Sequence, residues 1–326
     1  MNAVIIDQFG DPEHLRIGEW PKPSIKKGEI LVKVAATALN RADTLQRMGK
    51  YPPPKGESSI MGLEMAGTVV EVGKNANRWQ PGDKVCGLLG GGGYAEYVSI
   101  HEDLAIPVPP GLSLEQAAAI PEVFLTAFQA LNWLAKVQPG ETVLIHAGAS
   151  GVGTAAIQLV KAMGATSMVT ASGGKHQVCL ELGAEKAIDY RRKDFKEMVL
   201  EYTDNRGVDV IIDFVGGPYF QKNLDALAAD GRMVLLAFLG GVKVPELNMA
   251  PILRKRLHIM GSTLRARSLE YKIRLSQDLQ DFAWPLFGKG QLKPIIDSVF
   301  DWTDVANAHR YMEANKNTGK IILKVS

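Results

Sequence analysis

The feature that constrains this chain most is a glycine-rich turn between an apolar strand pattern and a helical pattern, in residues 142–159 (TVLIHAGASGVGTAAIQL). A strand, a tight turn and a helix N-terminus together present backbone N–H groups and the positive end of the helix dipole to a pyrophosphate. A side chain at the glycine positions would block either the turn or the approach of the phosphate. The segment therefore predicts a dinucleotide-binding turn.

Measured against the dinucleotide fingerprint G-x-G-x-x-G, the first and third glycines are Gly148 and Gly153. The middle position holds Ser150, with Gly151 beside it. A glycine cluster alone is a weak signal, but here a strand pattern precedes it, a helix pattern follows, and further alternating units come after. The expected contacts of the dinucleotide are Gly148, Ser150, Gly151, Val152 and Gly153.

The patterns along the chain indicate two domains. The first 110 residues read as short apolar or alternating strands separated by turns, at 29–39, 65–73 and 94–100. From about residue 140, strands alternate with helices, as in a doubly wound parallel sheet of the Rossmann type. The expected fold class is therefore α/β.

Two longer helical patterns and the C-terminal tail complete the organisation. The helices are expected at 113–136, with Ser113 as N-cap, and at about 267–288. The strand-like tail GKIILKV is expected to return to the first domain. The predicted domains are a β-rich unit of residues 1–120 plus 265–326 and a dinucleotide-binding unit of residues 121–264.

The residues after the next expected strand favour NADP over NAD. An NAD enzyme usually carries an acid about 20 residues past the glycines, which binds the ribose hydroxyls. Between Gly153 and Glu181 this chain has no Asp or Glu. An open turn at Gly173 followed by the cation of Lys175 suits a 2′-phosphate, although a solvated lysine at a helix start would look the same. The missing acid favours NADPH.

Composition argues against several classes of protein. A formal net charge of +2 gives no support for nucleic acid or an anionic membrane as the main partner. The longest apolar stretch, residues 233–242, is far shorter than a membrane span. The N-terminus reads as a strand rather than a signal peptide, and the two cysteines imply no disulfide framework. We expect a cytoplasmic protein.

Several motifs resemble one known family. They are GLEMAGTVVEVG (62–73), AAAIPEVFLTAFQAL (117–131), IHAGASGVGTAAIQL (145–159) and MEANKNTGKIILKV (312–325). In this order and at this spacing they are similar to the quinone oxidoreductase branch of the medium-chain dehydrogenase/reductase superfamily. The resemblance spans nearly the whole chain. It implies a GroES-like catalytic domain, a Rossmann domain, NADPH and substrate held between them, and a homodimer.

The resemblance also implies roles for individual residues. Asn40, Asp43 and Tyr51 match positions that line the substrate and nicotinamide pocket, and Thr126 matches a contact of the nicotinamide amide. Further positions match contacts of the 2′-phosphate or flank the nicotinamide: Gly173, Lys175 and Tyr190 for the first, Phe238 and Leu239 for the second.

The chain departs from zinc-dependent relatives at two places. Where those relatives carry G-H-E, this chain has Gly62-Leu63-Glu64, and leucine cannot bind a metal. Their structural zinc needs four cysteines, whereas this chain has two, Cys86 and Cys179. We therefore expect no metal and interpret Glu64 as a structural acid.

Without a metal or a flavin motif, the chemistry must come from the nicotinamide, and an electron-poor quinone suits hydride transfer because it demands no strong acid. Tyr51 is the candidate hydrogen-bond donor to the substrate, although packing against the following prolines explains it equally well. Read from sequence alone, Asn40 is a turn residue and Asp43 a helix cap. His146 is expected in the core, and Arg265 and Arg267 are expected to be solvated.

Two alternatives remain open at the sequence level. The nearest is an NADPH-dependent reductase of enones or enoyl thioesters, which the same scaffold could perform with Tyr51 as proton donor. The second is an NADPH-binding protein with little catalysis, or an RNA-binding protein, against which the low net charge argues.

Overall fold

The computed structural model describes residues 1–326, which form two units. The first unit combines residues 1–125 with 264–326, and the second comprises residues 126–263. The first boundary lies five residues later than expected, inside helix α3 (Pro121–Phe128). A boundary within a continuous helix leaves no turn signal in the sequence, which explains the difference.

A seven-stranded sheet forms most of the first unit, in the order β14-β15-β3-β4-β5-β7 with β6 paired to β3. The last strand, β15 (Lys320–Lys324), pairs antiparallel with β3 (Glu29–Ala38), so the C-terminal tail does return to this unit. The remaining strands are β4 (Glu64–Val72), β5 (Lys84–Leu88), β6 (Tyr97–His101), β7 (Ala105–Pro107) and β14 (Ile296–Asp301).

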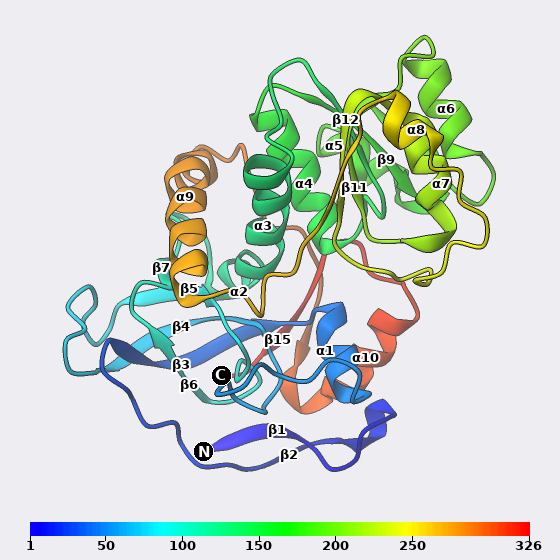
Figure 1. The fold of residues 1–326 in the computed structure, drawn as a ribbon. Helices are drawn as coiled ribbons and strands as arrows, with labels where there is room; N and C mark the ends of the chain where they lie inside the picture. The colour runs from blue at the N-terminus through cyan, green and yellow to red at the C-terminus, as the bar shows by residue number, and fades with distance from the viewer. The chain divides into compact units, whose positions relative to one another are not determined.

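Smaller elements cover this sheet and complete its core. The N-terminal hairpin of β1 (Asn2–Ile6) and β2 (Leu15–Glu19) is a separate two-stranded sheet, joined by η1 (Pro12–His14) (Figure 1). Its residues share one apolar cluster with Trp302, Val305 and Met312. The helices of the unit are α1 (Arg41–Arg47), α2 (Leu114–Ala118), α9 (Leu269–Gly288) and α10 (Val305–Glu313), with η4 at Trp302–Asp304.

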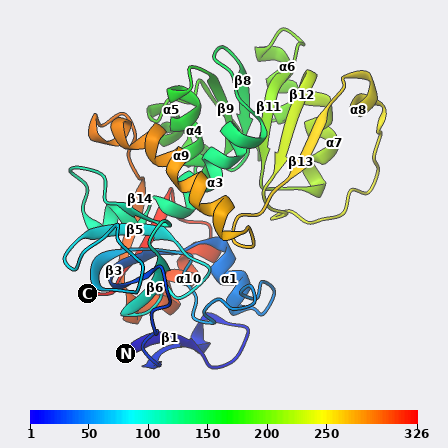
Figure 2. The ribbon, with the colours of Figure 1, turned by 60° about the vertical axis from the view of Figure 1, so that its left-hand side comes forward.

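The second unit is a parallel sheet of six strands in the order β10-β9-β8-β11-β12-β13. Helices α4 and α5 lie on one side of it and α6 and α7 on the other (Figures 1 and 2). This confirms the doubly wound arrangement. Its strands are β8 (Thr142–Ile145), β9 (Thr166–Ala171), β10 (Lys186–Asp189), β11 (Val208–Asp213), β12 (Leu227–Leu235) and β13 (His258–Gly261). Its helices are α4 (Gly151–Ala162), η3 (Gly173–Lys175), α5 (His176–Glu181), α6 (Phe195–Tyr202), α7 (Gly217–Ala226) and α8 (Ala250–Arg254).

The long helix expected at 113–136 is wrong as a single element. Helix α2 ends at Ala118, α3 begins at Pro121, and residues Gln129–Leu134 continue as a wider π-helical turn, η2. Proline has no N–H to donate into a preceding helix and therefore separates α2 from α3. None of the helices is long and apolar enough to cross a membrane.

The close pairing of β3 with β4 gives a prediction on stability. A Cβ atom on Gly67 would lie 2.1 Å from the carbonyl oxygen of Lys33 and 2.8 Å from Val32 Cγ1. Because backbone cannot yield as a flexible side chain can, Gly67→Ala should destabilise the protein by about 1–3 kcal/mol or more in urea unfolding. Gly288→Ala is the control, since its Cβ would meet nothing within 4 Å, and equal stabilities would contradict the account.

Candidate active site

The loop that follows strand β3 is held by the carboxylate of Asp43. Its Oδ2 atom accepts the backbone N–H of Asn40 at 2.8 Å and the hydroxyl of Tyr94 at 3.3 Å, and its Oδ1 atom accepts the N–H of Gly62 at 3.2 Å. The carboxyl group is buried, which raises its pKa to about 6 against the opposing effect of the Asn40 and Gly62 amides. Asp43 therefore caps helix α1, the role that its position in the sequence favoured.

A buried ion pair lies beside this cap. Glu64 at the start of β4 is 0% exposed, Lys320 at the start of β15 is 3% exposed, and Lys320 Nζ lies 2.7 Å from Glu64 Oε1. The ammonium also donates to the carbonyl oxygen of Leu39 at 2.8 Å and to Asn40 Oδ1 at 2.7 Å. Three acceptors satisfy its three N–H groups, as a buried cation requires.

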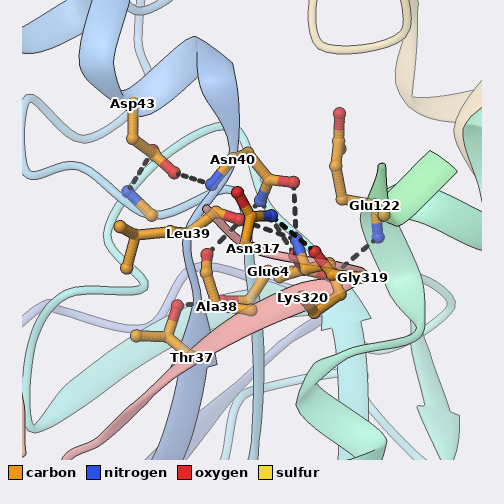
Figure 3. Close-up of polar contacts among 12 residues, drawn as sticks. Thr37, Ala38, Leu39, Asn40, Asp43, Glu64, Glu122, Asn317, Gly319 and Lys320 are labelled. Atoms are coloured by element: carbon orange, nitrogen blue, oxygen red, sulfur yellow. Dashed lines mark hydrogen bonds and ion pairs between the residues drawn. The ribbon is translucent and has the colours of Figure 1, made fainter. Parts of the chain in front are cut away.

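The side-chain amide of Asn40 belongs to the same network (Figure 3). Its Nδ2 atom donates to Glu64 Oε1 at 2.8 Å and to the carbonyl oxygen of Ala38 at 3.3 Å, while Oδ1 accepts from Lys320. The structure thus joins two of the expected site residues, Asn40 and Asp43. The nitrogen and the oxygen of the Asn40 side-chain amide both form hydrogen bonds within the chain, so Asn40 positions its neighbours.

Glu122, at the start of α3, completes the network on its other side. Its backbone N–H donates to Glu64 Oε2 at 2.9 Å, whereas its own carboxyl group points away from Glu64 (Figure 3). Burial and the negative charge of Glu64 raise the pKa of the Glu122 carboxyl to about 8, although Lys320 acts in the opposite direction. This side chain therefore holds a proton at neutral pH.

Arg265 lies close to these acids, and the expectation that it is solvated is wrong. It is 5% exposed, its Nε atom donates to the carbonyl oxygen of Gly90 at 2.8 Å, and Nη2 donates to Gln46 Oε1 at 2.7 Å. Its guanidinium lies 5.2 Å from the ring centre of Tyr51. Acceptors far along the chain, on the loop 88–92 and on helix α1, hold it, and the local sequence does not show them.

Tyr51 is half-buried beside this guanidinium. Burial and the nearby Glu122 raise the pKa of its hydroxyl, which keeps the proton that a hydrogen-bond donor needs. The structure thus brings Tyr51, Arg265, Glu122 and Asp43 within electrostatic reach of one another.

In the second unit, the glycine turn has the geometry that a dinucleotide needs. A Cβ atom at Gly148 would lie 2.5 Å from Val169 Cβ, and one at Gly153 would lie 2.4 Å from the carbonyl oxygen of Ala147. Ser150 is the N-cap of α4, and its Oγ atom accepts the N–H of Gly153 at 3.1 Å. The amides of Gly151 and Val152 remain without an acceptor inside the helix, as in any first turn.

His146 lies between strand β8 and the glycine turn. It is fully buried, with Nδ1 3.0 Å from Thr170 Oγ1 and Nε2 2.8 Å from Asn223 Oδ1, and Asn223 in turn donates to Asp213. Burial lowers the pKa of the imidazole. The side chain is thus the core residue that the sequence indicated.

Gly173, which follows strand β9, lies against an acid that the sequence did not single out. A Cβ atom on Gly173 would lie 2.9 Å from Asp189 Oδ2, so the end of β10 lies against this glycine. The Asp189 carboxylate accepts the N–H of Arg191 at 3.1 Å and lies 3.7 Å from Arg192 Nε. Because Asp189 is on the next strand, a search 20 residues past the glycines misses it.

Three further expected contacts have a distinctive environment. The hydroxyl oxygen of Thr126 is buried and has no hydrogen-bond partner in the chain. Such an orphaned group is rare in native proteins and marks a place where a ligand can supply the partner. Phe238 and Leu239 are 52% and 55% exposed, although both are apolar.

The residues around Glu64 do not fit a zinc site. No three His, Cys, Asp or Glu side chains lie where they could hold a metal ion. Leu63 fills the position next to Glu64, and the Glu64 carboxylate already accepts three hydrogen bonds. Cys86 is buried, which raises the pKa of its thiol and makes it a poor metal ligand.

Sequence reasoning missed Glu122, Lys320 and Tyr94. The available signals were a carboxylate between Pro121 and the apolar run VFLTAF, and a lysine at the head of the apolar strand IILKV. Each is a charged residue next to a strongly apolar segment. Such a residue can be buried with a partner, but the sequence does not show which residue that partner is.

Comparison with known families agrees with this geometry. Residues 26–110 match the alcohol dehydrogenase GroES-like domain, and residues 151–280 match the zinc-binding dehydrogenase domain. The first match lies within the first unit, and the second covers most of the second unit and continues into α9 of the first. Together they define an oxidoreductase that uses a nicotinamide cofactor.

Among curated proteins, the human quinone oxidoreductase is 32% identical over 330 residues, which cover 99% of this chain and 97% of that protein. A phenolphthiocerol/phthiocerol polyketide synthase of Mycobacterium tuberculosis is 31% identical, but the chain spans only 14% of its length. The chain belongs to the medium-chain dehydrogenase/reductase superfamily and has quinone oxidoreductases among its relatives.

Three solved structures have the same fold along 99–100% of both chains. An NAD-dependent alcohol dehydrogenase superposes with a TM-score of 0.89 at 32% identity, and the CurK enoyl reductase with 0.88 at 29%. The quinone oxidoreductase from Coxiella burnetii superposes with 0.82 at 34% identity. The fold alone therefore fits more than one substrate.

The buried ion pair gives the prediction of this section. Lys320→Met should cost about 3–5 kcal/mol in urea unfolding, because it leaves the Glu64 carboxylate buried without a counter-charge. Adding Glu64→Gln to that variant should restore part of the loss, since the buried charge is then gone. Purely additive effects of the two substitutions would show that the pair is not coupled.

Proposed function

We propose that this protein is an NADPH-dependent quinone reductase that works without zinc. The observation that carries the proposal is the Glu64–Lys320 ion pair. Because Lys320 occupies the Glu64 carboxylate, the acids and hydroxyl groups around it include no set of metal ligands. A site without a Lewis acid suits an acceptor that is already electron-poor. The human and Coxiella burnetii relatives that are named quinone oxidoreductases support this choice.

NADPH is the proposed cofactor, held by the glycine turn and by Thr126. The cation of Lys175 and the side chain of Tyr190 would surround the 2′-phosphate next to Gly173. Asp189 lies nearby and would oppose a phosphate, but its carboxylate is paired with Arg192 and with the Arg191 amide. The local balance of Lys175, Arg191 and Arg192 against one acid favours the phosphorylated cofactor.

When bound, NADPH supplies a hydride to the acceptor. The Tyr51 hydroxyl donates a hydrogen bond to an acceptor oxygen, and Arg265 keeps the tyrosine ring in place. The Glu122 carboxyl group holds the proton that neutralises the reduced oxygen, and Asn40 and Asp43 hold the loop on which these groups depend.

An activated alkene is the second candidate substrate. The structural likeness to the CurK enoyl reductase favours it, and a proton from Glu122 or Tyr51 could reach the α-carbon of an enone. We further propose a homodimer, which the exposed Met249 and Leu253 next to edge strand β13 support, and a cytoplasmic location.

The test of the proposed function is the rate of NADPH oxidation with 1,4-benzoquinone, a naphthoquinone and an enone, repeated with NADH. The quinones should be reduced with a kcat/KM at least about tenfold above that of the enone, and NADPH should be preferred to NADH. Lys175→Met should reduce the preference for NADPH, whereas the exposed Lys161→Met should not. A faster enone would make the protein an alkene reductase, and tight NADPH binding without turnover would make it a binding protein.

The proton held by Glu122 predicts a pH dependence. Because its carboxyl pKa is about 8, the group is protonated below that pH and loses its proton above it. The kcat/KM for the quinone should therefore fall as pH rises through about 8, and Glu122→Gln should be slower and should lack this decline. An unchanged profile in the variant would assign the proton to another group.

A further inference from the structure

The first unit contains a cavity of about 590 Å³ that the proposed reaction does not use. Asn40, Asp43, Tyr51 and Glu122 are not among its lining residues. The cavity lies among the arm 20–26, the loops 56–60 and 88–92, strand β6 and the start of α9. Its volume falls within the range of small-molecule sites, roughly 300–1,000 Å³.

Lys272 on α9 is the decisive residue of the cavity wall. It is 7% exposed, and its ammonium group has no hydrogen bond or ion pair in the chain. Lys320, which is buried to a similar degree, has three acceptors. Lys272 lines the cavity, so a ligand there can pair with an ammonium group for which the chain itself supplies no acceptor.

The rest of the wall also favours an anion. Four cationic side chains and two carboxylates line the cavity, which gives its wall a net formal charge of +2. The cations are Lys22, Lys26, Arg267 and Lys272, and the carboxylates are Glu29 and Glu57. Glu29 is turned toward the arm, where it accepts the N–H of Lys26 at 2.9 Å. The amides of Gly90 and Gly91 donate to no acceptor in the chain.

Apolar and aromatic groups form the other part of the wall. The side chains of Trp20, Leu104 and Leu269 line the cavity, and Tyr97 carries Lys22 4.5 Å above its ring. A mixed wall of this kind suits a molecule with an apolar body and a charged end better than a bare ion.

We propose that this cavity binds a small organic anion, whose carboxylate or phosphate pairs with Lys272 and whose apolar body packs against Trp20. The site is distinct from the proposed acceptor site and does not depend on it. The two are connected through Gly90, which lines the cavity and whose carbonyl oxygen accepts from Arg265 beside Tyr51.

The test is a titration of the cofactor-free protein with hexanoate, n-hexyl phosphate and hexanol, followed by tryptophan fluorescence and by calorimetry. Hexanoate or hexyl phosphate should bind saturably, and the stronger of the two identifies the headgroup. Hexanol should bind far more weakly because it lacks the charge. Trp20→Phe should remove the fluorescence response while the calorimetric signal remains.

Variants of Lys272 test the pairing directly. Lys272→Met should weaken anion binding by about 10- to 100-fold, as expected for a lost charge-assisted hydrogen bond, and Lys272→Arg should retain most of it. The exposed Lys289→Met at the other end of α9 is the control. The ligand-free Lys272→Met protein should unfold at the same or a higher temperature, because the substitution removes no hydrogen bond or ion pair within the chain.

Three results would overturn the proposal. They are a wild-type protein that binds neither anion, equal binding of hexanol and hexanoate, and equal anion affinity in wild type and Lys272→Met. Quinone reduction is measured in parallel, and its persistence in Lys272→Met would separate this site from the reductase site.

Discussion

The ion pair of Glu64 with Lys320 is the interaction on which the architecture of the first unit depends. It joins the start of β4 to the start of β15. These strands belong to the two segments of the first unit, which the second unit separates in the sequence. A buried ion pair is stable only if its remaining hydrogen-bonding groups also have partners. Here the Asn40 side chain, the Leu39 carbonyl and the Glu122 backbone amide are those partners. The loop after β3 and the start of α3 are therefore fixed by the same two charges.

This arrangement also determines the available chemistry. With Glu64 occupied, the site offers proton donors and hydrogen bonds but no set of metal ligands. The two neighbouring acids differ in environment. Asp43 accepts three hydrogen bonds and has a carboxyl pKa of about 6, whereas burial and the charge of Glu64 raise the carboxyl pKa of Glu122 to about 8. The two carboxyl groups thereby have separate roles, one structural and one able to carry a proton.

The sequence predicted what local patterns encode. The glycine turn, the alternation of the second unit and the return of the C-terminal strand follow from periodicity and turn chemistry, and the structure has all three. Arg265, Lys320 and Asp189 owe their roles to partners far along the chain, such as Gly90 and Glu64, so no local pattern indicates them. The break at Pro121 was visible in the sequence, but the apolar run across it suggested one continuous helix.

We propose that the reductase site works without a metal. This proposal is tested most directly by measuring the zinc content of the purified protein together with its rate of NADPH oxidation by 1,4-benzoquinone, before and after dialysis against a chelator. We expect a rate that is unchanged by dialysis and independent of zinc content. A rate that falls as zinc is removed and returns when zinc is added would contradict it.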